Sequence, residues 1–377
     1  MNSIIYLDYN ATTPIAPEVR EEILPFLEGS FGNPSCSHVY GLKAREGVDL
    51  ARRRVAELLG VSPLEVVFTS GGSESNNFAI KGLAWRQPAG KNHIITSQIE
   101  HPAVLEVCRF LKKNGFRVTY LPVDRFGRVN PEDVKKAITT ATLLVTIMHA
   151  NNEVGTIQPI PEIAEITRQH GVLLHSDAAQ SVGKIPVTIA SLGVDLLTIA
   201  GHKLYAPKGI GALFIRDGVV LENLIHGAAH ELGRRAGTEN VALAAGLGKA
   251  CQIAADSLSA TTSKLRQLRD RLQEGLLSNL PKAVVNGHPE FRLPNTLSIS
   301  FPGIEANQII ENLPDLAISA GAACHSDRVQ VSHVLKAMGV PEKVAMGTLR
   351  LSLGKMTMES EIEQAIHLIT GAVRKLA

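Results

Sequence analysis

The sequence predicts an α/β protein in which a large domain with a mostly parallel sheet precedes a smaller α+β domain. Two observations carry this prediction. Short apolar runs typical of buried strands alternate with stretches of helical spacing over the first two thirds of the chain. Near residue 255 this pattern gives way to a long helix followed by shorter elements. We expect an N-terminal segment, 1–15, that packs with the small domain, then a large domain, 16–255, and a small domain, 256–377.

The individual elements follow from their spacing. A helix that stops at Gly60, a plausible C-cap, is marked by Ala44, Val48, Ala51, Val55 and Leu58. The buried-strand candidates are HIITS at 93, LLVTIM at 143, VLLHS at 172, DLLTIA at 195 and ALFI at 212. In the small domain a long helix carries Leu265, Leu268, Leu272 and Leu276, and the strand candidates are LSISF, LAIS and LRLSL.

Composition excludes several classes of protein. The chain has 377 residues, 45% of them hydrophobic, and a formal charge of +2, values typical of a globular protein. No apolar run is long enough to cross a bilayer and no signal-type segment opens the chain, so we expect a cytoplasmic location and no membrane partner. Basic residues are scattered, which argues against nucleic-acid binding. The cysteines lie far apart without a CxxC pair, which argues against disulfides or a four-thiolate zinc site: Cys36, Cys108, Cys251 and Cys324.

Two polar residues follow predicted strands at positions suited to a cofactor. Asp177, in HSDAAQ, comes at the end of a strand, where open α/β sheets present ligand-binding groups. Lys203, in GHKLYAPKG, follows the next strand. A lysine that forms a Schiff base and an aspartate that pairs with a pyridinium nitrogen are what pyridoxal 5'-phosphate (PLP) requires. Each residue alone is also compatible with a helix N-cap or a surface amine.

The segment TSGGSESNN at 69–77 has two interpretations. Gly71, Gly72 and Ser73 stand at the start of a predicted helix, where backbone N–H groups can bind a phosphate, but such a turn can also be a simple helix start. His101, in IEHPAV, is either held by backbone contacts before a proline or lies against a cofactor ring. These residues alone leave both alternatives open.

Taken together and in order, these motifs resemble those of cysteine desulfurases, which are PLP enzymes of the class V aminotransferase fold. The motifs, which extend over nearly the whole chain, are YLDYNATTP, FGNPSCSH, TSGGSESNN, ANNEVGTIQP, HSDAAQ, GHKLYAPKG and GRRAGTEN. The resemblance implies a mostly parallel sheet of the seven-stranded type in the large domain. It also implies a homodimer whose active sites draw on both subunits.

The resemblance assigns roles to residues of this chain. Lys203 would form the Schiff base with PLP and carry the proton at the substrate Cα, Asp177 would pair with the pyridinium, and His101 would stack on the ring. The remaining cofactor contacts would come from Gln180 at the phenolic oxygen, Asn152 between cofactor and substrate, and Gly72, Ser73, His202 and the neighbouring subunit's Thr238 at the phosphate. Arg350 would clamp the substrate carboxylate. Asn33 would also bind substrate.

Cys324, in SAGAACHSD, is by composition a buried filler, a metal ligand or a nucleophile. The resemblance makes it the nucleophile, on a flexible loop of small residues. Its thiolate would take sulfur from L-cysteine as a persulfide, release L-alanine, and hand sulfur to an acceptor such as an iron–sulfur scaffold or a thiolation system. His325 and His333 are near enough in sequence to lower the pKa of the thiol.

Departures from the family pattern leave an alternative. Ala200 stands where many members carry a serine that contacts the phosphate, and Ala228, Ala229 and Leu232 change a segment near the active site. GAACHSD and TIAGHK are also similar to selenocysteine lyases, which release selenium from L-selenocysteine. A plain transaminase and a non-enzymatic sulfur or metal carrier using Cys324, His325 and His333 fit the sequence less well.

Overall fold

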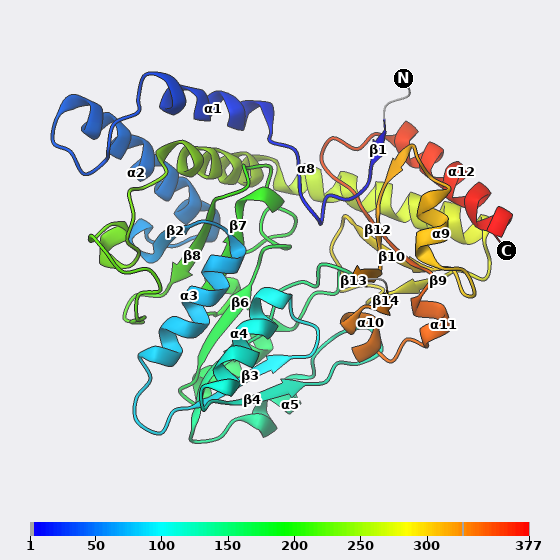
Figure 1. The fold of residues 1–377 in the computed structure, drawn as a ribbon, viewed down its shortest axis with the longest axis horizontal. Coiled ribbons are helices and arrows are strands. Elements are labelled where there is room, and N and C mark those ends of the chain that lie inside the picture. Colours follow the sequence, from blue (N-terminus) through cyan, green and yellow to red (C-terminus); the bar gives the residue numbers. More distant parts are fainter. Residues whose placement is uncertain (1–3, 326–327, 377) are drawn as a thin grey trace.

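A computed structural model describes residues 4–325 and 328–376, with the backbone alone for 322–325 and 328–330. A large α/β unit lies beside a smaller unit, and both ends of the chain lie in the smaller one (Figure 1). The predicted fold class is confirmed. Among the described residues, no helix combines the length and the apolar character needed to cross a membrane.

The large unit is built on one seven-stranded sheet. In spatial order its strands are β2 (Val66–Thr69), β8 (Gly211–Ile215), β7 (Leu196–Ala200), β6 (Leu173–Asp177), β5 (Thr142–Thr146), β3 (His93–Ser97) and β4 (Arg117–Leu121). Only β8 runs antiparallel to its neighbours, and the other pairs in the sheet are parallel. Each strand candidate predicted for this unit overlaps a strand of the sheet.

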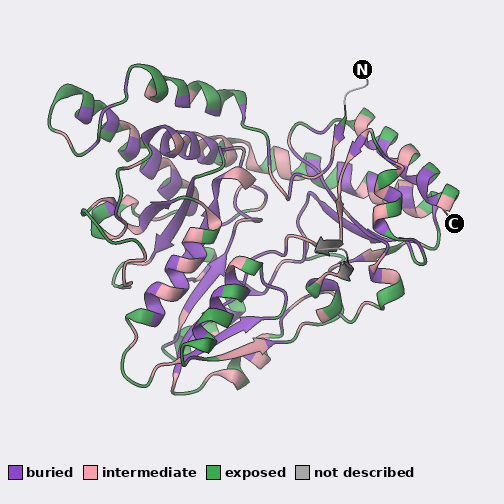
Figure 2. Cartoon of the chain, in the orientation of Figure 1, coloured by how far each residue is buried: buried purple, intermediate pink, exposed green. Residues whose placement is uncertain are grey.

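Helices cover both faces of this sheet. They are α1 (Pro17–Glu28), α2 (Val39–Leu59), α3 (Gly72–Trp85), α4 (Pro102–Lys113), α5 (Pro131–Ala137), α6 (Ile160–Gln169) and α7 (Ile189–Leu192). Successive strand residues point to opposite faces: Ile95 packs in the core with α2 and α6, and Ile94 packs in the core with α3 and α4. The inner strands are therefore almost fully buried, whereas the edge strand β4 is only partly so (Figure 2). Helix α2 ends at Gly60, which has the predicted left-handed cap conformation.

The long helix α8 (Val241–Asn279) starts in the large unit and ends in the small one. Its first half packs in the core of the large unit, and its predicted leucine stripe packs in the small unit. The helix therefore crosses residue 255, the expected domain boundary. The division at 15 and 255 stays a prediction.

The small unit contains a four-stranded antiparallel sheet of β12 (Ser319–Ala320), β15 (Thr348–Ser352), β10 (Thr296–Ser300) and β9 (Val284–Asn286). Its helices are α9 (Ala306–Glu311), α10 (His333–Ala337), α11 (Glu342–Ala345) and α12 (Glu359–Leu376). Strand β1 (Ile5–Tyr6) pairs in parallel with β11 (Leu316–Ala317), which joins the start of the chain to this unit. The predicted strand LAIS is split between β11 and β12, which lie in different sheets.

The segment around Cys324 differs from the predicted flexible loop. Its backbone forms an antiparallel hairpin of β13 (Ala322–His325) and β14 (Arg328–Val331), in which Cys324 is opposite Val329. Pairing between the two strands satisfies backbone N–H and C=O groups that a loop would leave to water. In Figure 1 the hairpin lies between the large and small units.

Candidate active site

Four segments bring polar residues to one edge of the seven-stranded sheet. Asp177 is the last residue of β6, and Lys203 ends a short 3-10 turn (Gly201–Lys203) directly after the neighbouring parallel strand β7. His101 precedes α4, and Gly72 begins α3 directly after β2. Because parallel strands end at the same edge of a sheet, these residues meet although they are far apart in the sequence.

These residues line a cavity of about 740 Å³. Nine of the predicted site residues are on its wall: Gly72, Ser73, His101, Asn152, Asp177, Gln180, His202, Lys203 and Arg350. Asn33 and Thr238 are exposed, and neither is on the wall of the cavity that the described residues form. The side chain of Cys324 lies outside the described part of the structure.

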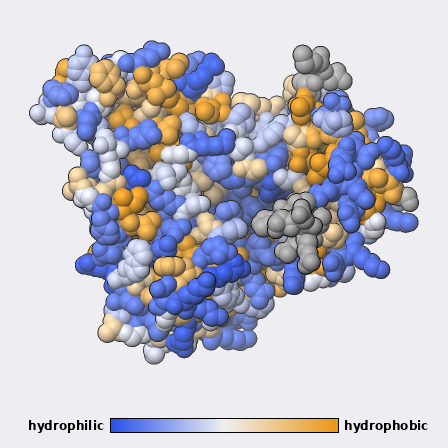
Figure 3. Space-filling model, viewed as in Figure 1, coloured by the Kyte–Doolittle hydropathy of each residue, from blue (hydrophilic) through white to orange (hydrophobic). Residues whose placement is uncertain are grey.

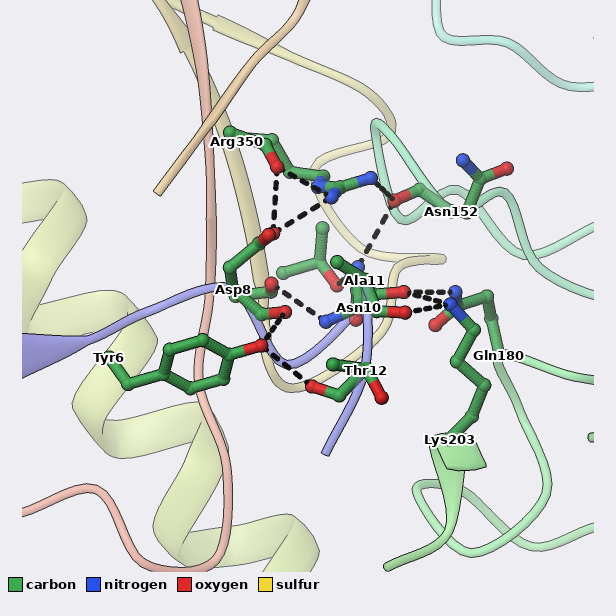
Figure 4. Close-up of polar contacts among 12 residues, drawn as sticks. Tyr6, Asp8, Asn10, Ala11, Thr12, Asn152, Gln180, Lys203 and Arg350 are labelled. Carbon is green, nitrogen blue, oxygen red and sulfur yellow. Dashed lines mark hydrogen bonds and ion pairs between the residues drawn. The ribbon is translucent and has the colours of Figure 1, made fainter. Parts of the chain in front are cut away.

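The Lys203 amine lies deep in this cavity. Its Nζ donates to the carbonyl oxygens of Asn10 (2.5 Å) and Ala11 (2.6 Å), both in the N-terminal segment (Figure 4). Burial lowers the pKa of Lys203 to about 8, and the nearby positive charge of Arg350 acts in the same direction. Near neutral pH, the neutral and therefore nucleophilic fraction of a lysine with such a pKa is far larger than that of a surface lysine.

Hydrogen bonds fix both oxygens of the Asp177 carboxylate. Oδ2 accepts from Asn76 Nδ2 at 2.6 Å, and Oδ1 accepts from the backbone N–H of Ala179 at 3.0 Å. The second contact is the local turn interaction considered for this aspartate, but the side chain also faces the cavity. Asn76 is 1% exposed, and its Oδ1 has no hydrogen-bond partner within the described residues. The wall of the cavity therefore holds a fixed carboxylate beside an unpaired amide oxygen.

Two histidines line the cavity in the neutral form. His101 Nδ1 accepts from the backbone N–H of Ala103 and so caps α4, as the first interpretation of this residue has it. The same residue lines the cavity, and its contact with a cofactor ring stays a prediction. Burial lowers the pKa of His101. His202 Nδ1 lies 3.2 Å from Thr12 Oγ1, and burial, with Lys203 adding to it, lowers the pKa of His202 to about 4.

The start of α3 forms one end of the cavity. Gly71 precedes the helix with a φ of +147°, a conformation that favours glycine, and no described side chain caps the first N–H groups of the helix. A Cβ on Gly72 would stand 3.2 Å from the Cβ of Ala200, so a side chain at position 72 would press on the cavity wall. The methyl group of Ala200 supplies no hydroxyl at this end.

Arg350 reaches the cavity from β15 of the small unit. Its Nη2 donates to Asp8 Oδ1 at 2.8 Å and to Ser319 Oγ at 2.9 Å, and Nη1 donates to the Asn152 carbonyl at 3.3 Å. Its Nε is buried without a partner among side chains and backbone that the structure describes. The guanidinium is thus held at the junction of the two units by groups from several segments (Figure 4).

A second cavity of about 540 Å³ adjoins the first and shares three wall residues with it: His101, Asn152 and Arg350. Gly321 and Val331, which flank the described backbone of the Cys324 hairpin, are also on its wall. His333 is also on this wall, and its Nε2–H donates to the Glu100 carbonyl oxygen at 3.0 Å, which fixes the ring. The hairpin therefore begins and ends beside the entrance to the Lys203 cavity.

Comparison with known proteins shows the family to which this chain belongs. Residues 5–365 match the model of the family described as Aminotransferase class-V. The chain belongs to the class V aminotransferase family. It is 45% identical over 377 residues to a cysteine desulfurase IscS of Methanosarcina thermophila, covering all of this chain and 93% of the relative. It is also 45% identical to a cysteine desulfurase IscS of Dictyoglomus turgidum, covering all of this chain and 96% of that one.

Solved structures of class V aminotransferase relatives agree. A NifS-like protein superposes with a TM-score of 0.94 at 39% identity, covering 99% of this chain and all of that one. SspA, solved in complex with cysteine, superposes with a TM-score of 0.83 at 39% identity, covering 94% and 99% of the two chains. The resemblance to cysteine desulfurases that the ordered motifs indicated is confirmed.

Sequence reasoning on this member of the class V aminotransferase family missed four residues that line the cavity or bond to its wall residues: Asp8, Asn10, Asn76 and Lys184. Lys184 Nζ donates to Oε1 of the wall residue Gln180 at 2.7 Å. The first three lie inside motifs that carried the resemblance, YLDYNATTP and TSGGSESNN, so the signal was present without a role attached to it. Lys184 follows HSDAAQ by four residues and gives no signal of its own, because a lysine is ordinarily exposed.

Proposed function

We propose that this protein is a PLP-dependent cysteine desulfurase that converts L-cysteine to L-alanine and leaves the sulfur as a persulfide on Cys324. Its identity with cysteine desulfurases over the full chain supports this activity. The observation that carries the proposal is one cavity in which Lys203, with a pKa of about 8, lies beside the fixed carboxylate of Asp177 and the uncapped start of α3.

The residues of the cavity fit PLP. The Lys203 amine, which is partly neutral, can react with the aldehyde of PLP. The buried carboxylate of Asp177 can pair with a protonated ring nitrogen of PLP. The free N–H groups of α3 match a phosphate, and the room between Gly72 and Ala200 suits a group that comes close to backbone. Lys203, Asp177, His101 and Gln180 would hold the ring, and Gly72, Ser73 and His202 the phosphate. When bound, PLP supplies an electron sink for chemistry at the substrate Cα.

Arg350 and Lys203 would act on the substrate itself. The guanidinium of Arg350 already binds a carboxylate, that of Asp8, at 2.8 Å, and a substrate carboxylate in the cavity would compete for the same two-pronged donor. Asn152, on the wall beside it, would help to place the substrate. Lys203 Nζ, freed to its amine form, would take the Cα proton and later return one at Cβ or Cα, because it lies in the cavity with a lowered pKa.

Cys324 would accept the sulfur. Gly321 precedes its hairpin and Val331 is the last residue of the hairpin, and both are on the wall of the cavity that adjoins the Lys203 site. In the overall reaction the S–Cβ bond of L-cysteine breaks, an S–S bond to Cys324 forms, and the Cys324 thiol proton ends on L-alanine. No external oxidant is needed, because the substrate carbon is reduced as the two sulfurs become a persulfide.

Partners follow from the same family relationship. We expect a homodimer in which Thr238, exposed in one chain, contributes to the site of the neighbouring subunit, and in which Asn33, also exposed, binds substrate. Exposed apolar side chains near Asn33, including Phe31, Val39 and Tyr40, support a subunit contact there. Figure 3 shows apolar surface over α1 and α2 in that region. The acceptor, an iron–sulfur scaffold or a thiolation partner, and a cytoplasmic location stay predictions.

The test is to measure L-alanine formed by the PLP-loaded protein from L-cysteine and, separately, from L-selenocysteine. We expect alanine from L-cysteine in the wild type, none with Cys324→Ala, and full activity with Cys251→Ala, a buried cysteine remote from the site. The visible cofactor band should be absent in Lys203→Ala. Alanine from L-selenocysteine alone, undiminished in Cys324→Ala, would make the protein a selenocysteine lyase, and release of a keto acid would make it a transaminase.

A further inference from the structure

Lys184 is a buried lysine behind the wall of the Lys203 cavity. It follows β6 by seven residues, and only 7% of its surface is exposed. Lysines are rarely buried to this extent unless each N–H group has a partner. None of the roles assigned above to the cavity residues uses Lys184.

Within the part of the chain that the structure describes, the amine of Lys184 has two acceptors. Nζ donates to Gln180 Oε1 at 2.7 Å and to Asn10 Oδ1 at 3.3 Å. At the other end of the same carboxamide, Gln180 Nε2 donates to the backbone carbonyl of Asn10 at 3.0 Å. Both ends of the Gln180 side chain are therefore held.

These contacts allow only one orientation of the Gln180 amide. Turning it over would set Nε2 against the Lys184 amine, two donors, and Oε1 against the Asn10 carbonyl, two acceptors. In the orientation present, one N–H bonds to Asn10 and the second N–H of the amide remains for a ligand in the cavity. A phenolic oxygen, which accepts hydrogen bonds, is the group that such a donor suits.

The charge of Lys184 fits this role. Burial lowers its pKa well below the ordinary value, and the positive charges of Lys203 and Arg350 lower it further. A neutral amine has two N–H groups, the number of its acceptors, and needs no carboxylate partner. The lowered pKa thus favours the uncharged amine of Lys184 beside Lys203.

We propose that Lys184 is a positioning residue that fixes the carboxamide of Gln180 with its NH₂ group directed at the cofactor. This inference rests on the proposed function, because it takes PLP as the ligand of the cavity. Lys184 acts through Gln180 and Asn10 and does not touch the cofactor. Without it, Gln180 Oε1 loses its donor, and the amide is free to present either end to the cavity.

The test is a double-mutant cycle on full-length protein freed of cofactor. The dissociation constant for PLP is measured by equilibrium dialysis for the wild type, Lys184→Met, Gln180→Ala and the double variant, with melting temperature recorded in parallel. Methionine keeps most of the volume of lysine and removes its donors. Lys249→Met is the matched control, since Lys249 Nζ also donates to a glutamine, Gln252 Oε1 at 3.2 Å, in a helix remote from the cavity.

We expect Lys184→Met to weaken PLP binding about 3- to 10-fold, the range of one neutral hydrogen bond, and to have no further effect once Gln180 is alanine. Lys249→Met should leave PLP binding unchanged. An equal effect of Lys184→Met in both backgrounds would overturn the proposal, because Lys184 would then act independently of Gln180. A lower melting temperature with unchanged PLP binding would overturn it too, by making the role structural alone.

Gln180→Glu keeps the test decisive if Lys184→Met does not fold. Glutamate retains an acceptor for Lys184 but has no N–H for the cofactor, so we expect PLP binding as weak as in Gln180→Ala. Wild-type affinity in Gln180→Glu would overturn the proposal. Failure of the wild type itself to bind PLP would instead refute the proposed function, which keeps the two failures distinct.

Discussion

The chemistry of this site depends on the charge state of one lysine, Lys203. Its amine is neutral at a lower pH than that of an ordinary lysine because it is buried and because Arg350 lies near it. In the folded chain without cofactor, protons therefore leave Lys203 near pH 8, below the range in which an exposed lysine titrates.

This charge state predicts how fast the cofactor-free protein captures PLP. Only the neutral amine attacks the aldehyde, so the rate should rise about tenfold per pH unit below the Lys203 pKa and level off above it. Arg350→Gln should move the midpoint to higher pH by removing a positive charge, and Arg374→Gln, on the exposed face of α12, should not. The rate is followed by the visible band, and a rise that continues unbroken past pH 10 would show an ordinary lysine.

Arg350 should distinguish a two-pronged clamp from a simple positive charge. Arg350→Lys keeps the charge but loses the parallel N–H groups, so we expect kcat/KM for L-cysteine to fall about 10- to 100-fold, chiefly through KM. The alanine assay measures this directly. An unchanged kcat/KM would mean that the arginine serves only its contacts with Asp8 and Ser319.

At the scale of elements, a buried ion pair ties helix α2 to the segment before α8. Arg52 and Glu231 form two hydrogen bonds, at 2.7 and 2.9 Å, and Glu231 also accepts from the backbone N–H of Phe68 in β2. Both residues are buried. The pair stands beside Leu232, one of the residues that depart from the family pattern, so Glu231 anchors that segment to the sheet.

Arg52→Met should lower the free energy of unfolding by about 3–5 kcal/mol, because it leaves the Glu231 carboxylate buried without its partner. Urea denaturation measures this value. Arg271→Met is the matched control: Arg271 pairs with Glu363 and Glu359 on the surface, and its loss should cost no more than about 1 kcal/mol. Equal costs for the two variants would contradict the assignment of a buried pair.

The elements also show what the sequence could and could not predict. The central strands were predictable because they are buried on both faces and several read as continuous apolar runs, as ALFI does in β8. The path of α8 was not, since its first half is rich in alanine and packs against α2 and α1 without a leucine stripe. The strand pairing of β13 and β14 was hidden by small residues that have little preference for strands.

In the site, the residues whose place on the cavity wall could be predicted were those whose type matches a known chemical task, such as Lys203 and Asp177. Asn10 and Lys184 were not predictable, because their role depends on contacts between distant segments. The role of a buried amide or amine depends on its hydrogen-bond partners, and the fold determines which residues those are.

At the scale of the whole molecule, Asn10 connects the Lys203 cavity to both units. Its side chain donates to Thr296 Oγ1 at 2.8 Å and accepts from Asn295 Nδ2 at 3.0 Å in the small unit. Its backbone carbonyl accepts from Gln180 and Lys203 of the large unit. The N-terminal segment therefore lies between the two units and contacts Lys203 directly (Figure 4).

Asn10→Ala should destabilise the protein by about 1–3 kcal/mol, because buried groups on both units lose a partner. Chemical denaturation tests this, with Asn114→Ala as control, since the Asn114 side chain bonds to the Phe110 carbonyl at the end of its own helix on the surface. A cost in Asn10→Ala no larger than in the control would contradict a connecting role for this residue.

The most direct test of the central claim is the mass of the peptide that contains Cys324 after the PLP-loaded protein has reacted with L-cysteine. The account predicts that this peptide gains one sulfur atom, that the gain matches the first alanine released, and that Lys203→Ala abolishes both. Alanine formation with no sulfur on Cys324, or sulfur found on Cys36 in its place, would contradict the account.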